Sequence, residues 1–73
     1  MQRYANRSGG SGVFAYEIGL DYIKIKFNGT TKIYQYSYSG RAGQRHVDNM
    51  KLLASKGSGL NAYINSHVKY KYD

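Results

Sequence analysis

The Asn-Gly pair at positions 28 and 29 is the feature of this sequence that most constrains its fold. It separates two stretches, residues 22–27 and 32–38, in which apolar and polar residues alternate. Asn and Gly tolerate the positive φ angles of a tight reversal, and such a pair between alternating runs is the strongest short-range indication of a β-hairpin. We therefore expect two antiparallel strands, joined by a loop of two residues (Asn28, Gly29) or of four residues ending at Thr31.

Both loop lengths assign the same side chains to the same face of the hairpin, because an odd position on the first strand then meets an even position on the second. The apolar face is expected to carry Ile23, Ile25, Phe27, Tyr34, Tyr36 and, near the strand end, Tyr38. The opposite face is expected to carry Tyr22, Lys24, Lys26, Ile33, Gln35 and Ser37. The first face is the predicted core, and the second is predicted to be wet and basic.

Residues 13–18 alternate in the same way and predict a further strand before the hairpin. If the short connection at residues 19–21 acts as an even-length loop, Phe14 and Tyr16 join the face of Ile23 and Ile25. Three strands with one apolar face are the minimum for independent stability.

Residues 1–12 end in a Ser/Gly-rich stretch that has little to bury, so they are predicted to be a flexible leader. Arg3 and Arg7 could make this leader a basic arm, and a simple untethered terminus is the alternative.

After Tyr38 the spacing of apolar residues changes to three and four, which predicts an amphipathic helix from about Gln44. Its apolar stripe is Val47, Met50, Leu53 and Ala54. Gly57 is the expected stop and Ser58 the expected N-cap of a second helix. The stripe of that second helix is Leu60, Tyr63, Ile64 and Val68. The tail from Val68 is expected to stay helical to about Tyr70, with a short edge strand as the alternative.

Two amphipathic helices and a sheet with one apolar face can bury their apolar sides only against each other. The predicted fold is therefore α+β: a three-stranded antiparallel meander with two C-terminal helices packed on one face, in the order β-β-β-α-α. A single domain is expected over residues 13–73.

Charge and composition restrict the partners that this domain can have. Eleven Lys and Arg stand against four Asp and Glu, for a net charge of +7, which favours an anionic partner such as RNA or another nucleic acid, or an acidic protein surface. The sequence contains no Cys, no apolar run long enough to span a membrane and no hydrophobic signal region. We expect a cytoplasmic protein that needs no cofactor, metal or membrane. The sequence leaves the oligomeric state open and favours a monomer.

Three groups of residues are predicted to contact nucleic acid. Tyr22, Lys24, Lys26 and Gln35 place an aromatic ring among cations, as in single-strand binders, although a solvated sheet face is the alternative. The run Lys56, Gly57, Ser58 and Gly59 precedes a helix and suits an anion, although a C-cap followed directly by an N-cap is the favoured alternative. Arg41 and Arg45, together with His46, near the start of the first helix are expected to add a basic rim.

Several motifs together resemble the KTSC domain, a small bacterial module named for the C-terminal end of some lysyl-tRNA synthetases. They are Tyr16-Glu17, Tyr34-Gln35-Tyr36 and the run from Leu53 to Asn65, which includes Ser55-Lys56-Gly57 and Asn61-Ala62-Tyr63-Ile64-Asn65. The resemblance covers roughly residues 11–70. It implies a module of uncertain role, for which RNA binding is a guess, and it carries over no catalytic residue. The sequence departs from the family at Gly40-Arg41-Ala42-Gly43, where a Val-Pro-like helix entry is usual, and in a shortened spacing before Tyr16.

A second functional class is a protein-interaction or self-association module. A three-stranded sheet leaves two edges, and Val13 and Ile33 are expected on its otherwise polar face. Catalysis is not expected, because His46 and Asp48 are two residues apart and so would not share a helix face. Two histidines without cysteines do not predict a zinc site either.

Overall fold

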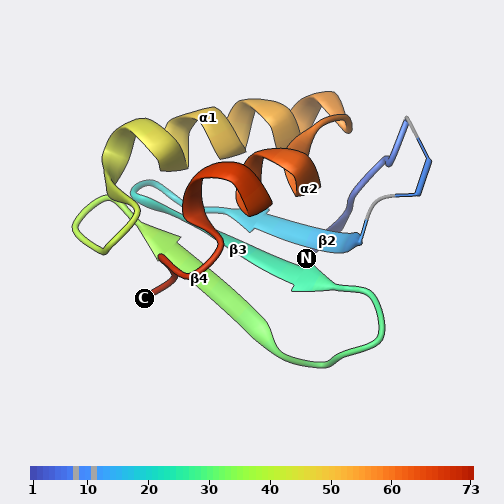
Figure 1. Cartoon of the computed structure of the whole chain (residues 1–73), viewed down its shortest axis with the longest axis horizontal. Coiled ribbons are helices and arrows are strands. Elements are labelled where there is room, and N and C mark those ends of the chain that lie inside the picture. Colours follow the sequence, from blue (N-terminus) through green and yellow to red (C-terminus); the bar gives the residue numbers. More distant parts are fainter. Residues whose placement is uncertain (8, 11) are drawn as a thin grey trace.

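One antiparallel sheet with two helical segments on one of its faces makes up the architecture (Figure 1). The computed structural model describes residues 1–7, 9, 10 and 12–73. The strands, in the order in which they pair, are β1 (Gln2–Arg3), β2 (Val13–Ile18), β3 (Tyr22–Phe27) and β4 (Ile33–Ser37). The helices are α1 (Gly43–Lys56) and α2 (Leu60–Tyr63), and α2 continues into the π-helix η1 (Ile64–Val68). The predicted α+β class is confirmed, but the sheet has four strands and not three.

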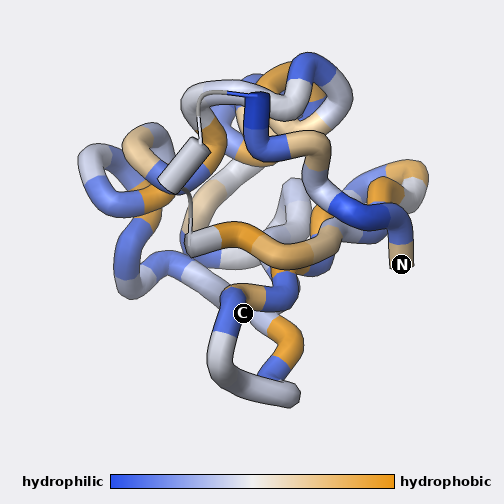
Figure 2. The backbone as a smooth tube through the Cα atoms, turned by 90° about the vertical axis from the view of Figure 1, so that its right-hand side faces the viewer, coloured by the Kyte–Doolittle hydropathy of each residue, from blue (hydrophilic) through white to orange (hydrophobic). Residues whose placement is uncertain are grey.

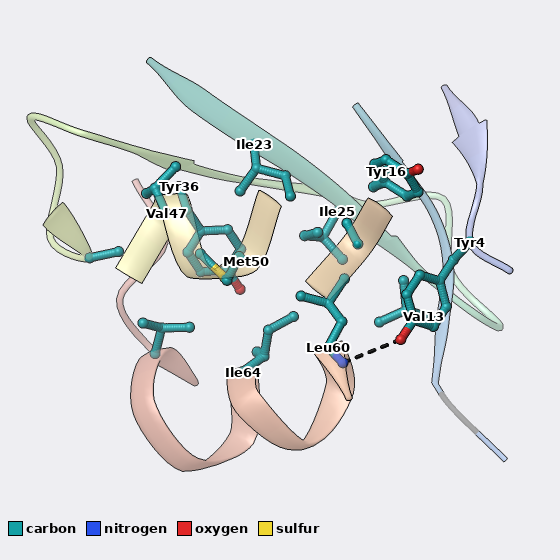
Figure 3. Close-up of a cluster of buried hydrophobic side chains, with 13 residues drawn as sticks. Tyr4, Val13, Tyr16, Ile23, Ile25, Tyr36, Val47, Met50, Leu60 and Ile64 are labelled. Atoms are coloured by element: carbon teal, nitrogen blue, oxygen red, sulfur yellow. Dashed lines mark hydrogen bonds between the residues drawn. The ribbon is translucent and has the colours of Figure 1, made fainter. Parts of the chain in front are cut away.

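The central hairpin has the predicted faces. Strands β3 and β4 pair Ile23 with Tyr36 and Ile25 with Tyr34. The pairing of Lys26 with Ile33 excludes the two-residue loop and agrees with the register of the four-residue alternative. Residues 28–32 lie between the two strands, and Gly29 among them has a φ of 81°. Ile23 and Ile25 are fully buried and Tyr36 is 1% exposed, so this face forms the floor of the core (Figure 3).

A β-bulge in β2 overturns one predicted side-chain direction. Gly19 donates its N–H to the Tyr22 carbonyl, so the reversal between β2 and β3 consists of Leu20 and Asp21 and is even. Tyr16 therefore pairs with Ile25 and joins the core as expected. Between Val13 and Ala15 the register shifts by one residue, because β2 has one residue more than β3 there. Val13 is therefore buried on the core face, and Phe14 lies on the opposite face. The predictions that Phe14 lies on the same face as Ile23 and that Val13 lies on the polar face were wrong.

The first residues of the chain belong to the domain and are not a separate leader. Gln2 and Arg3 pair with Tyr16 and Ala15 of β2. Tyr4 is 5% exposed, and its hydroxyl accepts a 3.2 Å hydrogen bond from the backbone N–H of Leu60. The rest of the predicted leader includes Ser8 and Ser11, which lie outside the described residues.

Helix α1 ends where the sequence predicts. Gly57 adopts the left-handed conformation (φ 74°), and its N–H donates to the carbonyls of Leu53 and Ala54, which are otherwise unpaired at a helix end. Val47, Met50 and Ala54 are buried, while Leu53 is partly buried against the same core.

The second helical segment differs from the prediction at both ends. Its N-cap is Gly59 (φ 83°) and not Ser58, and the distant Tyr4 hydroxyl accepts the N–H of Leu60, its first residue. Leu60, Ile64 and Val68 are spaced by four and are all buried. The i→i+5 bonding of the π-helix puts more residues in each turn, which suits a stripe spaced by four.

The tail is neither helix nor strand after Val68. A turn at Lys69 and Tyr70 brings the chain back to β4 (Figure 1), where Asp73 donates its N–H to the Gln35 carbonyl at 2.7 Å. Tyr72 thereby meets Tyr34, with ring centroids 4.9 Å apart. The helical segment thus ends two residues before the predicted end at about Tyr70, and the alternative of an edge strand is not formed.

Hydrophilic and hydrophobic residues alternate along much of the chain, as is typical of strands and helices with one buried side (Figure 2). Within the described residues, no helix is both long and apolar enough to cross a membrane.

Candidate nucleic-acid interface

The sheet face opposite the helices carries the first predicted group. The register places Tyr22 beside Ser37, Lys24 beside Gln35 and Lys26 beside Ile33. All four predicted residues of this group, Tyr22, Lys24, Lys26 and Gln35, are partly exposed. The structure thus brings this group together on one surface, which we call the outer face.

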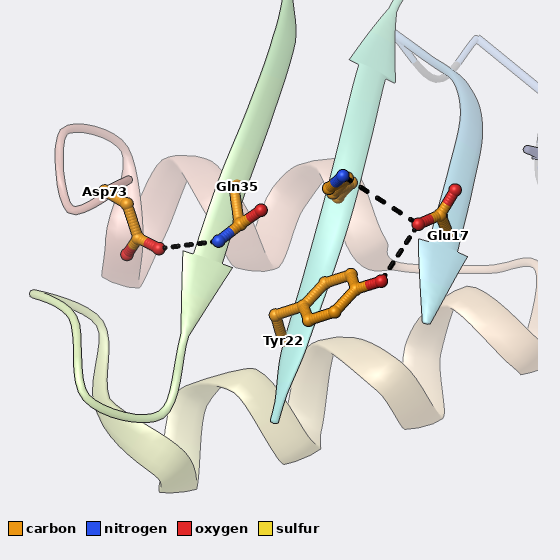
Figure 4. A network of polar contacts seen from close by, with 5 residues as sticks. Glu17, Tyr22, Gln35 and Asp73 are labelled. Carbon is orange, nitrogen blue, oxygen red and sulfur yellow. Dashed lines mark hydrogen bonds and ion pairs between the residues drawn. The ribbon is translucent and has the colours of Figure 1, made fainter. Parts of the chain in front are cut away.

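Glu17 of β2 organises one side of the outer face (Figure 4). Its carboxylate accepts a 3.0 Å hydrogen bond from the Tyr22 hydroxyl and lies 3.9 Å from the Lys24 ammonium. The bond to the carboxylate, followed by its negative charge, raises the pKa of Tyr22. The Lys24 ammonium also lies 5.4 Å from the centroid of the Tyr22 ring. The outer face is therefore less basic than predicted, since an acid shares the space between its ring and its lysine.

Asp73 occupies the other side of the outer face. Its carboxylate accepts 3.2 Å hydrogen bonds from the Gln35 side-chain amide and from the backbone N–H of Ser37. Partial burial raises the pKa of this carboxyl, but the hydrogen bonds from Ser37 and Gln35 outweigh it and lower the pKa overall. Gln35 is thus engaged by the tail as well as placed on the outer face.

Phe14 and Arg3, which the sequence analysis did not assign to this surface, complete the outer face. The Phe14 ring has the Arg3 guanidinium and the Lys26 ammonium each 4.4 Å from its centroid. The β2 bulge turns this ring outward, and the pairing of β1 brings Arg3 beside it. A bulge leaves no clear trace in an alternating pattern, so the sequence offered no signal for this cluster beyond an arginine within the predicted leader.

The second predicted group, the turn of Lys56, Gly57, Ser58 and Gly59, is covered by the start of the chain. Arg7 donates its backbone N–H to the Gly57 carbonyl at 2.7 Å and its Nε–H to the Lys56 carbonyl at 2.9 Å. A Cβ on Gly57 would lie 2.5 Å from the Cβ of Ala5. Because the Leu60 N–H is bonded to Tyr4 as well, the structural interpretation of this run as consecutive caps is the better one.

Arg41 and Arg45, the third predicted group, are exposed at the start of α1. Helix α1 has 14 residues and so spans about 21 Å, which separates these arginines from the turn at its other end. Arg45 belongs to α1, which packs on the sheet face opposite to the outer face (Figure 1), and Arg41 lies in the loop just before α1. The three predicted groups therefore do not form one continuous surface.

Comparisons with protein-family models, with curated proteins and with solved structures return no match. The resemblance to KTSC domains accordingly stays a prediction.

The two histidines lie together between α1 and η1. The rings of His46 and His67 stack with centroids 5.6 Å apart, and His46 Nδ1 lies 2.6 Å from the Tyr63 hydroxyl, which also accepts a bond from Asn49. Burial, followed by the nearby charges of His67, Lys71 and Arg45, lowers the pKa of His46. Over the described residues, no group of three or more His, Cys, Asp or Glu side chains could hold a metal ion.

Proposed function

We propose that this protein is a non-enzymatic, KTSC-like binding module whose outer face binds single-stranded nucleic acid, most readily RNA. The observation that carries the proposal is the cluster of Arg3, Phe14 and Lys26 on the sheet face opposite to the described helices. Single-strand binders combine cations that meet phosphates with rings on which bases stack. The net charge of +7 favours the same partner.

The cations of the outer face are expected to bind the phosphates of the strand and so to expose the aromatic rings. Phosphates would draw the ammonium groups of Lys24 and Lys26 away from the rings that they now cover, which would leave the Phe14 ring free to stack on a base. The Arg3 guanidinium offers a second plane for stacking. Glu17 and Asp73 oppose the binding of a phosphate, so we expect few phosphate contacts and modest affinity.

The salt dependence of RNA binding tests this proposal. If Arg3, Lys24 and Lys26 each neutralise one phosphate, the slope of log K against log salt is roughly −2 for a single strand. Affinity for a labelled single-stranded RNA should then fall about 20-fold between 50 mM and 200 mM salt. An affinity that does not change with salt, or no binding at 50 mM, contradicts the proposal.

A charge-matched pair of variants locates the binding surface. Lys24→Glu/Lys26→Glu reduces the net charge from +7 to +3, because each change removes two charges, and it should abolish binding. Arg41→Glu/Arg45→Glu makes the same reduction away from the outer face and should leave most of the affinity intact. Equal losses in the two variants would indicate a general charge effect instead of a site.

A protein-interaction role is the second candidate, and exposed apolar side chains support it. Leu20 in the β2–β3 turn is 96% exposed, and Leu52 on α1 is 61% exposed. Lys51, the neighbour of Leu52, donates to the Leu20 carbonyl at 3.1 Å, so α1 passes close to this turn. The expectation that a sheet edge or the apolar residues of the polar face bind a partner is weaker. Val13 is buried, and the tail already bonds to the outer edge of β4.

Sedimentation velocity across a wide range of concentrations tests self-association. A Leu20→Ser/Leu52→Ser variant should stay monomeric where the parent associates. A parent that is monomeric throughout removes self-association and leaves only a different partner protein.

A further inference from the structure

A cavity of about 350 Å³ lies between the sheet and the C-terminal segment, on the helical side. Its lining comes from β3, the β3–β4 loop, β4, η1 and the tail, and includes Phe27, Tyr34, Tyr36, Asn65, Lys69 and Tyr70. Small-molecule sites are usually concave and mostly apolar, with volumes from roughly 300 to 1,000 Å³. The cavity falls at the lower end of that range, which suits a ligand of a few rings at most.

Aromatic rings form most of the lining. Tyr34 makes edge-to-face contacts with Phe27 at 5.6 Å and with Tyr72 at 4.9 Å between centroids. Tyr72 also lies 6.5 Å from Tyr36 at nearly a right angle. Tyr70 stands at the rim and is 71% exposed. Walls of this kind accept a flat aromatic ring, which can lie against the face of one side chain and the edge of another.

The Tyr36 hydroxyl is the polar group that most favours a ligand in this cavity. Tyr36 is only 1% exposed, and its hydroxyl bonds to no other group in the described part of the chain. In the described residues, every fully buried side-chain oxygen or nitrogen has a hydrogen-bond partner. The Tyr36 oxygen has none, so it is not fully buried and keeps some access to open space. Tyr36 lines this cavity. Burial, and then the proximity of Tyr34 and Tyr72, raises the pKa of Tyr36 to about 12, so this hydroxyl keeps its proton and can donate it in a hydrogen bond.

Two further polar groups lie at the cavity. The Asn65 side chain has no hydrogen-bond partner within the described residues, and its amide can both donate and accept. Lys69 brings an ammonium group, which lies 5.5 Å from the centroid of the Tyr70 ring. The described lining contains no carboxylate, so its charge is positive and complements an anion.

We propose that this cavity binds a nucleotide, with the base among the tyrosine rings, the base edge hydrogen-bonded to Tyr36 and Asn65, and the phosphate at Lys69. The cavity lies on the side of the sheet opposite to the outer face, so this proposal does not depend on the function proposed above. The same chemical unit occurs as a free mononucleotide and as one residue of a single strand.

Titration of the ¹⁵N-labelled protein with AMP, followed by NMR, tests the proposal. Backbone resonances of Asn65, Lys69 and Tyr70 should shift in a saturable way. Tyr70→Ala removes an exposed ring that the fold does not need, and it should weaken AMP binding roughly 5- to 150-fold, the range for one lost stacking contact. Tyr36→Phe should weaken binding about 2- to 13-fold through the lost hydrogen bond.

Controls separate this site from the outer face and from a structural effect. Lys24→Glu/Lys26→Glu should bind AMP like the parent protein even if it no longer binds RNA. Tyr36→Phe should unfold at the same or a higher urea concentration than the parent, since it loses no internal bond.

Three results would overturn the proposal. The first is the absence of shifts at the cavity with both AMP and an eight-nucleotide single-stranded RNA. The second is that inorganic phosphate alone reproduces the shifts, and the third is that Tyr70→Ala and Tyr36→Phe both bind like the parent. Shifts at the cavity with RNA but not with AMP would support the site and identify a strand as the source of the nucleotide.

Discussion

Removing one oxygen atom from Tyr4 should destabilise the whole domain, because this hydroxyl joins the first residues of the chain to the second helical segment. The Tyr4 hydroxyl accepts the N–H of Leu60, and both residues are buried (Figure 3). Tyr4→Phe keeps the ring in place but leaves that N–H in the core without a partner. An unsatisfied buried donor costs about 1–3 kcal/mol, and we take 1–2 kcal/mol because the 3.2 Å bond is long and neutral.

That loss is large for a chain of 73 residues. A core of this size rarely supplies more than about 3–5 kcal/mol of net stability, so roughly a fifth to two thirds of it is at stake. With a slope of about 1 kcal/mol per molar urea, the unfolding midpoint should fall by roughly 1–2 M. The melting temperature should fall by about 4–16 °C. Far-UV circular dichroism in urea and on heating measures both.

Tyr36→Phe is the matched control. It removes the same atom from a tyrosine that is equally buried but whose hydroxyl has no partner within the described residues. Its midpoint should match that of the parent or exceed it. Equal midpoints for Tyr4→Phe and Tyr36→Phe would refute the argument that Tyr4 caps the helix and that residues 1–7 are part of the fold.

Three further outcomes follow from the geometry. Gly57→Ala should cost at least ~1 kcal/mol more than Gly29→Ala in urea unfolding: both glycines have positive φ, but only at Gly57 does a Cβ meet Ala5. Lys51→Met should lower the free energy of unfolding by ~1–2 kcal/mol, since its ammonium donates to the backbone carbonyls of Gly19 and Leu20 in the β2–β3 turn at 2.8 and 3.1 Å. The pKa of His46 in an NMR titration should lie below its unfolded value of about 6.5. The packing of the neutral His46 ring then stabilises the fold fully above that pH, and this stabilisation is lost as the pH falls below it. A native pKa above the unfolded value would contradict the packing described.

Local sequence determined the elements that repeat a period over several residues. The Asn-Gly pair and the alternation on both sides of it set the faces of β3 and β4, because a hairpin register with period two leaves only two choices. The stripe from Val47 to Ala54 and the left-handed Gly57 set α1 and its end for the same kind of reason. These features need only neighbouring residues to be recognised, so the pattern alone predicted them.

The candidate outer face was predicted in part. Tyr22, Lys24, Lys26 and Gln35 lie together as their alternation requires. Phe14 was assigned to the wrong face, since one extra residue in β2 reverses every direction beyond it. Of the two acids on this face, Glu17 follows from its place next to Tyr16 in the alternating strand, whereas Asp73 could not be predicted, since it arrives from the far end of the chain.

Tertiary structure alone decided what the two ends of the chain do. Two paired residues are too few to show a period, so only the pairing with β2 makes Gln2 and Arg3 a strand. The Tyr4 hydroxyl replaces the expected Ser58 cap from 56 positions away, and Asp73 completes the edge of β4. Each of these contacts is formed by a short segment whose position depends on a surface that exists only after the sheet and helices have packed. Sequence periodicity encodes which side of an element is buried, whereas contacts of this kind depend on which distant group that side meets.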